Sequence, residues 1–189
     1  STFELTYATM FDPPEELHTR YEEALEKVMA NLGQEYGLLI NGEERFSKHK
    51  FKSYNPANTE QLLAQFQTGT VQDANDAVAA AKAAFPDWSR TPWQERVALL
   101  RKAADIMDKR LFEIAAVTSL EVGKNRMEAL GDVAETPALV RYACDQMEAN
   151  QGFEVKMGID PLPGYDITNT SKLRPYGVWL VISPFNFPA

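Results

Sequence analysis

The segment 176–182, Tyr-Gly-Val-Trp-Leu-Val-Ile, limits most strongly what this chain can fold into. It is a continuous apolar run with β-branched residues, a pattern typical of a strand buried on both faces. Such strands belong to parallel sheets, whose two faces are covered by helices. Because helical patterns precede the run, the sequence predicts an α/β fold. It is helix-rich, with short β-hairpins, an extended arm and 176–182 as the first strand of a parallel sheet.

Changes in pattern divide the chain into four parts. An N-terminal helical extension covers 1–36, and a helix-rich region with short hairpins covers 37–152. An irregular arm follows at 153–175. The last part, 176–189, combines the predicted strand with a loop at its carboxyl end, which is where ligands bind in open α/β sheets.

The extension predicts one amphipathic helix. It starts near Pro13–Pro14 and stops before Gly33, since proline suits a first helical turn and glycine a position just past the end. Apolar residues recur at helical spacing between these limits, at Leu17, Tyr21, Ala24, Val28 and Leu32.

Two turns are predicted next. Asn41–Gly42 lies between short apolar runs and favours a tight β-hairpin, because both residues tolerate positive φ. The segment Asn55-Pro56-Ala57-Asn58 predicts a second turn. A strand is expected after it, over 62–66.

The region 70–123 predicts helices. Thr70 is expected to cap the first helix and Pro86 to end it. Thr91 is expected to cap the next, with Pro92 at its first position. The predicted core positions of these helices are Ala74, Ala77, Val78, Ala81, Ala84 and Phe85, then Val97, Leu100, Ala104, Met107, Leu111 and Ile114.

That second helical stretch should bend near Lys109–Arg110 and close at Gly123. A further helix is predicted from Asn125 to Asn150. Pro137 interrupts it, which predicts a kink or a restart with Thr136 as the cap.

The arm, 153–175, loses helical periodicity and is punctuated by proline and glycine. This pattern predicts an extended excursion, with two short strands, that leaves the body of the protein. Such an arm suits contacts with another subunit, so a homo-oligomer is expected.

Composition excludes several function classes. The chain has 189 residues and a net charge of −8, so a nucleic acid partner is not expected. No apolar run reaches the roughly 18 residues of a membrane span, and the N-terminus lacks the features of a secretory signal. Cys144 is the only cysteine, which rules out an intrachain disulfide. The expected location is the cytoplasm, or the mitochondrial matrix in a eukaryote.

Few residues suggest chemistry. His18 and His49 have no triad or metal partners in the pattern and are interpreted as surface residues; no metal site is predicted. Cys144 is interpreted as a small buried hydrophobe on a helix. Neither a GxGxxG nor a GxxxxGK[ST] motif occurs, so the sequence carries no standard nucleotide fingerprint.

The loop Ser183-Pro184-Phe185-Asn186-Phe187-Pro188 is the remaining candidate. The Asn186 amide carries two donors, and its aromatic and proline neighbours restrict its motion. A preorganised amide at the end of a buried strand can stabilise an oxyanion. The alternative is an ordinary turn in which the asparagine bonds its own backbone.

Dispersed motifs resemble the aldehyde dehydrogenase family. ISPFNFP is similar to that family's Ile-Thr/Ser-Pro-Trp/Phe-Asn-Phe-Pro motif. LINGEE, YNPANTE, DANDAVAAAKAAFPDW, TPWQERVALLRKAADIM, SLEVGK and EALGDVAE precede it in the expected order. The resemblance covers about Leu38 to Ala189. The helical extension, Phe185, EVGKN and DVAE look most like the 1-pyrroline-5-carboxylate (glutamate γ-semialdehyde) dehydrogenases of proline catabolism.

The resemblance implies an enzyme that oxidises a small aldehyde to a carboxylate with NAD. It implies that 37–152 is the N-terminal part of an NAD-binding domain and that 153–175 is an oligomerisation arm. The family's catalytic cysteine and general base match no residue here. They are expected outside this segment, which is therefore expected to be an incomplete chain and inactive alone.

The resemblance also implies site residues. Asn186 would donate a hydrogen bond to the oxyanion. Phe187 would face the aldehyde tunnel. Glu135 would face the polar end of the substrate; the alternative is an ordinary solvated glutamate on a helix. The residues implied along the nicotinamide-ribose side of the cofactor are Ile182, Ser183, Pro184 and Phe185.

Two alternatives remain open. The substrate could be another aldehyde, such as succinate semialdehyde. If the gene ends at Ala189, the chain could instead be a non-catalytic helical interaction module with 153–175 as a docking arm.

Overall fold

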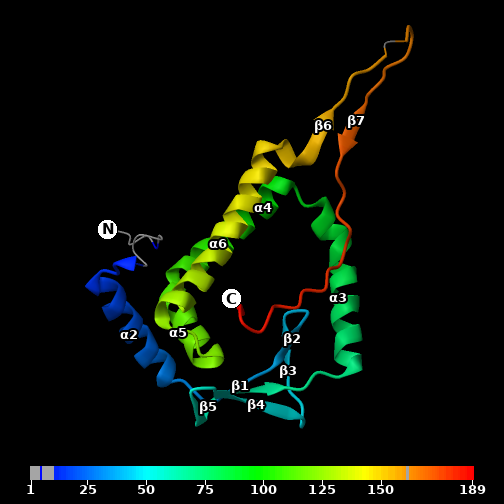
Figure 1. Cartoon of the computed structure of the whole chain (residues 1–189). Coiled ribbons are helices and arrows are strands. Elements are labelled where there is room, and N and C mark those ends of the chain that lie inside the picture. The colour runs from blue at the N-terminus through cyan, green and yellow to red at the C-terminus, as the bar shows by residue number, and fades with distance from the viewer. Residues whose placement is uncertain (1–4, 6–10, 161) are drawn as a thin grey trace.

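The computed structural model describes residues 5, 11–160 and 162–189. The helices and a small sheet form an open frame, from which a hairpin projects (Figure 1). The helices are α2 (Glu15–Met29), α3 (Val71–Arg90), α4 (Trp93–Lys109), α5 (Leu111–Val122) and α6 (Arg126–Ala149), followed by a 3₁₀ turn, η1 (Gln151–Phe153). The strands are β1 (Gln34–Tyr36), β2 (Leu38–Ile40), β3 (Glu43–Arg45), β4 (Lys50–Asn55), β5 (Asn58–Gln67), β6 (Glu154–Lys156) and β7 (Thr170–Lys172).

The hydrophobic core lies where α2, α5 and α6 meet. Leu17, Tyr21 and Ala24 of α2 are buried there, which confirms the apolar face predicted for this helix. The Tyr21 hydroxyl donates a hydrogen bond of 2.6 Å to Ser119 Oγ on α5. The other buried members of this core are Phe112, Ala115, Ala116, Ala129, Leu130 and Val133. Small residues at these positions let the helices approach closely.

Both predicted turns are confirmed. Strands β2 and β3 pair antiparallel, and Asn41 (φ 53°) and Gly42 (φ 79°) form the turn between them. Strands β4 and β5 pair antiparallel around Pro56–Ala57, and β1 pairs with β5 in parallel. The second strand is longer than predicted, because it runs over 58–67.

Thr70 caps α3 as predicted: its hydroxyl accepts from Asp73 N–H, and the Asp73 side chain accepts from the Thr70 backbone. The prediction that Pro86 ends this helix is wrong, since α3 continues to Arg90. Pro86 removes only one hydrogen bond from the helix. The Thr91 N–H closes the following turn on the carbonyls of Asp87 and Trp88.

The predicted cap of α4 is also wrong. Pro92 occupies the cap position and makes no side-chain hydrogen bond to α4. The Thr91 hydroxyl instead donates to the Asp87 carbonyl of α3, at 3.1 Å. Both helix ends compete for Thr91, and its position directly after α3 favours the carbonyl that the end of that helix leaves open.

The predicted core face of α3 is not buried in this chain. No residue of α3 is buried, and Val78 is 46 % exposed. Along α4, Val97 and Ala104 are buried as predicted, whereas Leu100 is 45 % exposed. The spacing therefore predicted the helices correctly but not the surface that each one buries.

The later helices follow the prediction in part. α4 and α5 break at Arg110, and Gly123 ends α5 in the left-handed region at φ 73°. α6 is one continuous helix that contains the fully buried Pro137, so no restart at Thr136 occurs.

The arm contains the two predicted strands. β6 and β7 pair antiparallel, and their hairpin extends away from the helices (Figure 1). No helix in the described part of the chain combines the length and hydrophobicity needed to span a lipid bilayer.

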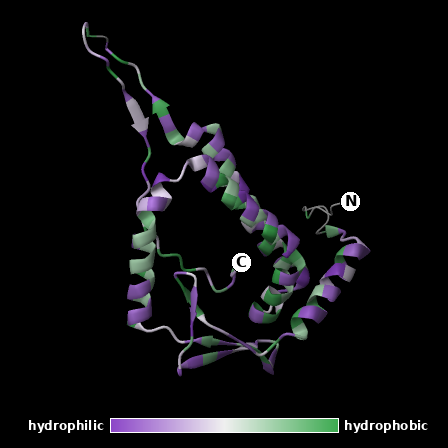
Figure 2. Ribbon diagram, turned by 180° about the vertical axis from the view of Figure 1, so that it is seen from behind, coloured by the Kyte–Doolittle hydropathy of each residue, from purple (hydrophilic) through white to green (hydrophobic). Residues whose placement is uncertain are grey.

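The segment 176–182 does not form the predicted buried strand in this structure. Its residues are assigned no strand and lie exposed, with Leu180 at 84 % and Val181 at 81 %. Much of this segment is coloured as hydrophobic in Figure 2. A strand needs a hydrogen-bonding neighbour, and the three sheets of the described residues, β1-β5-β4, β2-β3 and β6-β7, do not include it.

Candidate functional site

The loop 183–188 holds most of the predicted site residues. Its turn is closed by a hydrogen bond of 3.1 Å from the Phe187 N–H to the Pro184 carbonyl. Pro184 and Pro188 restrict the backbone on either side. Asn186 is exposed between them, and within the described residues its side-chain amide makes no hydrogen bond. The amide is therefore available to a ligand.

Lys124 lies directly beneath this loop. Its Nζ is 3.8 Å from the centroid of the Phe187 ring, a cation–π contact. The same atom is 2.9 Å from Asp132 Oδ2 on α6. The side chains of Lys124 and Asp132 are only 14 % and 5 % exposed. One ammonium group thus joins α6 to the loop.

The backbone around Lys124 is fixed on both sides. Gly123 ends α5 with a φ of 73°, a conformation that glycine adopts without strain. Asn125 caps α6, because its side chain accepts the Glu128 N–H at 2.9 Å. The lysine is therefore the middle residue of the three-residue connection between α5 and α6.

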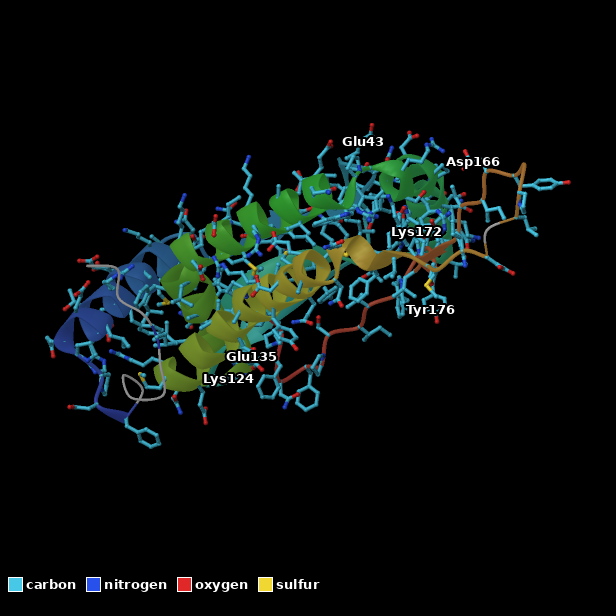
Figure 3. All side chains as sticks on the ribbon, turned by 90° about the horizontal axis from the view of Figure 1, so that it is seen from above. Glu43, Lys124, Glu135, Asp166, Lys172 and Tyr176 are labelled. Carbon is cyan, nitrogen blue, oxygen red and sulfur yellow. The ribbon has the colours of Figure 1, made fainter. Side chains whose placement is uncertain are left out.

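Glu135 lies on α6, three positions after Asp132, which places both on one face of the helix. Its side chain is exposed. In the view of Figure 3, Lys124 and Glu135 are labelled on the same side of the helices. The structure thus places the exposed Glu135 carboxylate on the same helix as Asp132, the ion-pair partner of Lys124.

The four predicted cofactor residues form the exposed approach to this turn. Ile182 is 81 % exposed and Phe185 89 % exposed, so both have apolar surface available for packing. Ser183 adds a hydroxyl, and Pro184 adds a rigid backbone. These groups fit a flat ring and a ribose hydroxyl. The loop 183–188 carries no basic side chain that could bind a phosphate.

The remaining candidates lie elsewhere. Cys144 is 1 % exposed on α6, with its Sγ 3.9 Å from the Val97 carbonyl, which confirms the buried interpretation. His18 is half-buried, and its Nδ1 is 2.9 Å from Arg126 Nη1 at the junction of α2 and α6, a contact that is neither a triad nor a metal site. No cluster of three potential metal ligands occurs in the described ranges.

Lys124 and Asp132 are the residues that sequence reasoning missed. Both lie inside motifs that were recognised, EVGKN and DVAE. The available signal was a lysine between a glycine helix stop and an asparagine cap, which fixes its backbone. Nothing in the spacing showed that this lysine would meet Phe187.

Comparison with known proteins places the fold in one family. The family profile described as "Aldehyde dehydrogenase family" matches residues 43–189, and the chain belongs to this family. The recognised resemblance and the predicted fold class, the N-terminal part of the aldehyde dehydrogenase fold, are confirmed.

Curated relatives narrow the comparison to one enzyme type. The chain is 37 % identical over 168 residues to 1-pyrroline-5-carboxylate dehydrogenase of Staphylococcus saprophyticus, covering 89 % of this chain and 32 % of that protein. It is 39 % identical over 167 residues to the enzyme of the same name from Geobacillus thermodenitrificans, covering 87 % and 31 %. The chain thus spans about a third of the length of these relatives.

Solved structures agree with the curated relatives. A 1-pyrroline-5-carboxylate dehydrogenase from Thermus with bound NAD superposes with a TM-score of 0.83 at 32 % identity, covering 100 % of this chain and 36 % of that chain. The Δ-pyrroline-5-carboxylate dehydrogenase of Mycobacterium tuberculosis, bound with NAD and cobalamin, gives 0.70 at 26 % identity, covering 79 % and 28 %.

Proposed function

We propose that the protein to which this chain belongs oxidises L-glutamate γ-semialdehyde, the open form of 1-pyrroline-5-carboxylate, to L-glutamate in proline catabolism, with NAD as the hydride acceptor. The observation that carries the proposal is the run of relatives named 1-pyrroline-5-carboxylate dehydrogenase, among them one 37 % identical across 89 % of the chain. The superposition on the NAD-bound Thermus enzyme supports the cofactor.

The proposed reaction needs a cysteine thiolate that attacks the aldehyde carbon, followed by loss of hydride and hydrolysis of the thioester. Cys144 does not suit this role, because it is buried and enclosed by α4 and α6. The chain covers about a third of its relatives, so we assign the thiolate and the general base to residues outside 1–189. NAD, when bound, supplies the acceptor for the hydride.

In this proposal, the chain contributes the group that stabilises the oxyanion and the contacts with the nicotinamide end of the cofactor. During thiolate attack, negative charge develops on the aldehyde oxygen, and the free Asn186 amide donates a hydrogen bond to it. Ile182 and Phe185 pack against the nicotinamide end of the cofactor, with Ser183 and Pro184 between them. The exposed state of all these residues supports such contacts.

Phe187 and Glu135 serve the substrate. The ring of Phe187 is 50 % exposed, with one face on Lys124, and its remaining surface is available to a carbon chain. The exposed Glu135 carboxylate on α6 can accept a hydrogen bond from the substrate's amino group, which glutamate semialdehyde has and succinate semialdehyde lacks.

The assembly and the location belong to the same proposal. We assign 153–175 to a homo-oligomer contact, supported by the hairpin's projection from the frame. The named curated relatives are bacterial proteins, which supports action in the cytoplasm.

The test is turnover by the purified full-length protein. NADH formation is followed by absorbance with glutamate semialdehyde, succinate semialdehyde and a simple aliphatic aldehyde. The expected result is the highest kcat/KM for glutamate semialdehyde, with no turnover by residues 1–189 alone. Preference for succinate semialdehyde would overturn the substrate assignment, and turnover by 1–189 alone would overturn the assignment of the thiolate.

A further inference from the structure

The loop 183–188 makes little polar contact with the rest of the chain. In the part of the chain that the structure describes, no hydrogen bond or ion pair joins 176–189 to the helices. The contact that spans this gap is the Lys124 ammonium over the Phe187 ring, at 3.8 Å. The position of that ammonium therefore influences the orientation of the turn.

The position of the ammonium is itself fixed. The Asp132 side chain is 5 % exposed, and a buried carboxylate needs a cation or hydrogen-bond donors. Lys124 meets this need at 2.9 Å, while its own side chain is only 14 % exposed. Low exposure also strengthens a cation–π contact, because less hydration is given up when the ring approaches.

Phe187 and Asn186 are connected through the backbone of one turn. The two residues are adjacent, and the turn that contains them is closed from Phe187 N–H to Pro184. Proline on each side leaves the turn few backbone rotations. The contact at the Phe187 ring therefore restrains the backbone of the turn from which the Asn186 side chain extends.

We propose that Lys124 is a positioning residue for the oxyanion donor: held by Asp132, it orients the Phe187 ring and thereby aims Asn186. This inference rests on the proposed function, since it assumes that Asn186 serves an aldehyde oxygen. Lys124 is not a substrate ligand in this assignment, because its ammonium is committed to Asp132 and to the ring.

The first test is Lys124→Met in the full-length enzyme. Displacements of about 1 Å at a reacting group cost up to about 100-fold in rate, so kcat should fall by roughly 10- to 100-fold. KM for the aldehyde and the Kd for NAD should change little. Lys124→Arg should recover much of the loss, since guanidinium also pairs with carboxylate and stacks on a ring. Lys102→Met, at an exposed position of α4, is the matched control and should behave as wild type.

Lys124→Met leaves the Asp132 carboxylate buried without its partner, which threatens folding. The pair Lys124→Met with Asp132→Asn removes both charges together. Its melting temperature should lie near that of the wild type, and its kcat loss should equal that of Lys124→Met. A folded pair with normal kcat would contradict the positioning role.

A cycle with Asn186→Ala separates positioning from general structural support. If Lys124 acts through Asn186, adding Lys124→Met to Asn186→Ala lowers kcat no further. Additive losses would overturn the inference, as would a raised KM confined to glutamate semialdehyde, which would make Lys124 a substrate ligand. If the wild type oxidises the aldehyde and the Lys124→Met variant has the same kcat, only the positioning role of Lys124 is refuted. If the wild type oxidises no aldehyde, the proposed function and the positioning role are both refuted.

Discussion

At the scale of single residues, the molecule depends on a few side chains whose surroundings are fixed. Asn186 is exposed in a turn bounded by Pro184 and Pro188. Beneath it, Phe187 rests on Lys124. In the proposed role of Asn186, this restrained turn would limit the conformational freedom that the donor loses when the reaction begins, which favours electrostatic stabilisation of a developing charge.

Replacing Asn186 by alanine in the full-length enzyme should lower kcat by roughly 10²–10³-fold, the scale of one lost oxyanion donor. KM should move less than kcat, and NAD affinity should hardly change, because the donor acts mainly in the transition state. Asn186→Asp should also be poor, since a carboxylate repels the developing charge. Steady-state kinetics with separate NAD binding measure this. A variant with normal kcat, or with a defect only in NAD binding, would show that Asn186 has a structural role and does not bind the oxyanion.

Position 152 requires glycine, because its backbone lies close to the Trp93 ring. It has a φ of 73°, and a Cβ added there would lie 2.3 Å from Trp93 Cδ1. Gly152→Ala should therefore lower the free energy of unfolding by about 1–3 kcal/mol, the cost of backbone strain together with a displaced ring. Denaturant unfolding measures the change. Gly158→Ala is the control, since no atom lies within 4 Å of its added Cβ, and equal stability of the two variants would contradict the prediction.

At the scale of elements, α3 shows how a helix can be defined locally without a buried face. Its start is secured by the reciprocal hydrogen bonds of Thr70 and Asp73. Arg45 of β3 reaches the same turn, with its Nη1 2.6 Å from Asp76 Oδ2. These contacts attach α3 to the β2–β3 hairpin, although no residue of α3 is buried in this chain.

The pKa of the Asp73 carboxyl lies below its ordinary value of 3.8, first because the Thr70 hydroxyl and N–H donate to it, and then because of Arg45. A lowered folded pKa adds stability above the unfolded value, and that stability is lost as pH falls through the folded pKa. Asp73→Asn should therefore lower the melting temperature at neutral pH. The difference from wild type should shrink below pH 3.8.

Thermal unfolding of both proteins across this pH range measures the effect. Asp160→Asn, in the exposed arm, is the matched control and should show no comparable difference at either pH. A difference between wild type and Asp73→Asn that stays constant with pH would show that the carboxylate's charge is not involved.

At the scale of the whole molecule, the chain is an open frame with a projecting hairpin (Figure 1). Several large apolar side chains of the hairpin are exposed. Val155, Met157 and Ile159 recur at every second position, with exposures of 54 %, 49 % and 52 %. Val155 lies on β6, and Met157 and Ile159 follow it beyond the strand. These three exposed side chains form a short apolar row along the chain that suits a contact with another subunit.

Val155→Glu should weaken the proposed homo-oligomer, because it places a charge in this row. β6 should still pair with β7, since that pairing uses backbone groups at Val155 and Ser171. Sedimentation of the full-length protein over a dilution series measures the assembly. Lys156→Glu, which points to the opposite side of the strand, is the control. If the Val155→Glu variant has the same oligomeric state as the wild type, the apolar row is not part of the interface.

The sequence by itself determined the local features of this protein. Asn41–Gly42 set a tight turn, Thr70 and Asp73 set a helix start, and Gly123 set a helix end, because each depends on backbone preferences and neighbouring groups. The ordered motifs likewise identified the family, and the loop 183–188 was found as the candidate site from its residue types alone.

Only the tertiary structure decided which surfaces meet. The apolar pattern of α3 and of 176–182 predicted burial, yet both are exposed, because burial needs a partner surface that local spacing does not specify. The helix α3 continues through Pro86 to Arg90, although proline by its local preference ends helices. The contact from Asp132 through Lys124 to Phe187 joins segments far apart in the sequence, so no pattern within either segment could predict it.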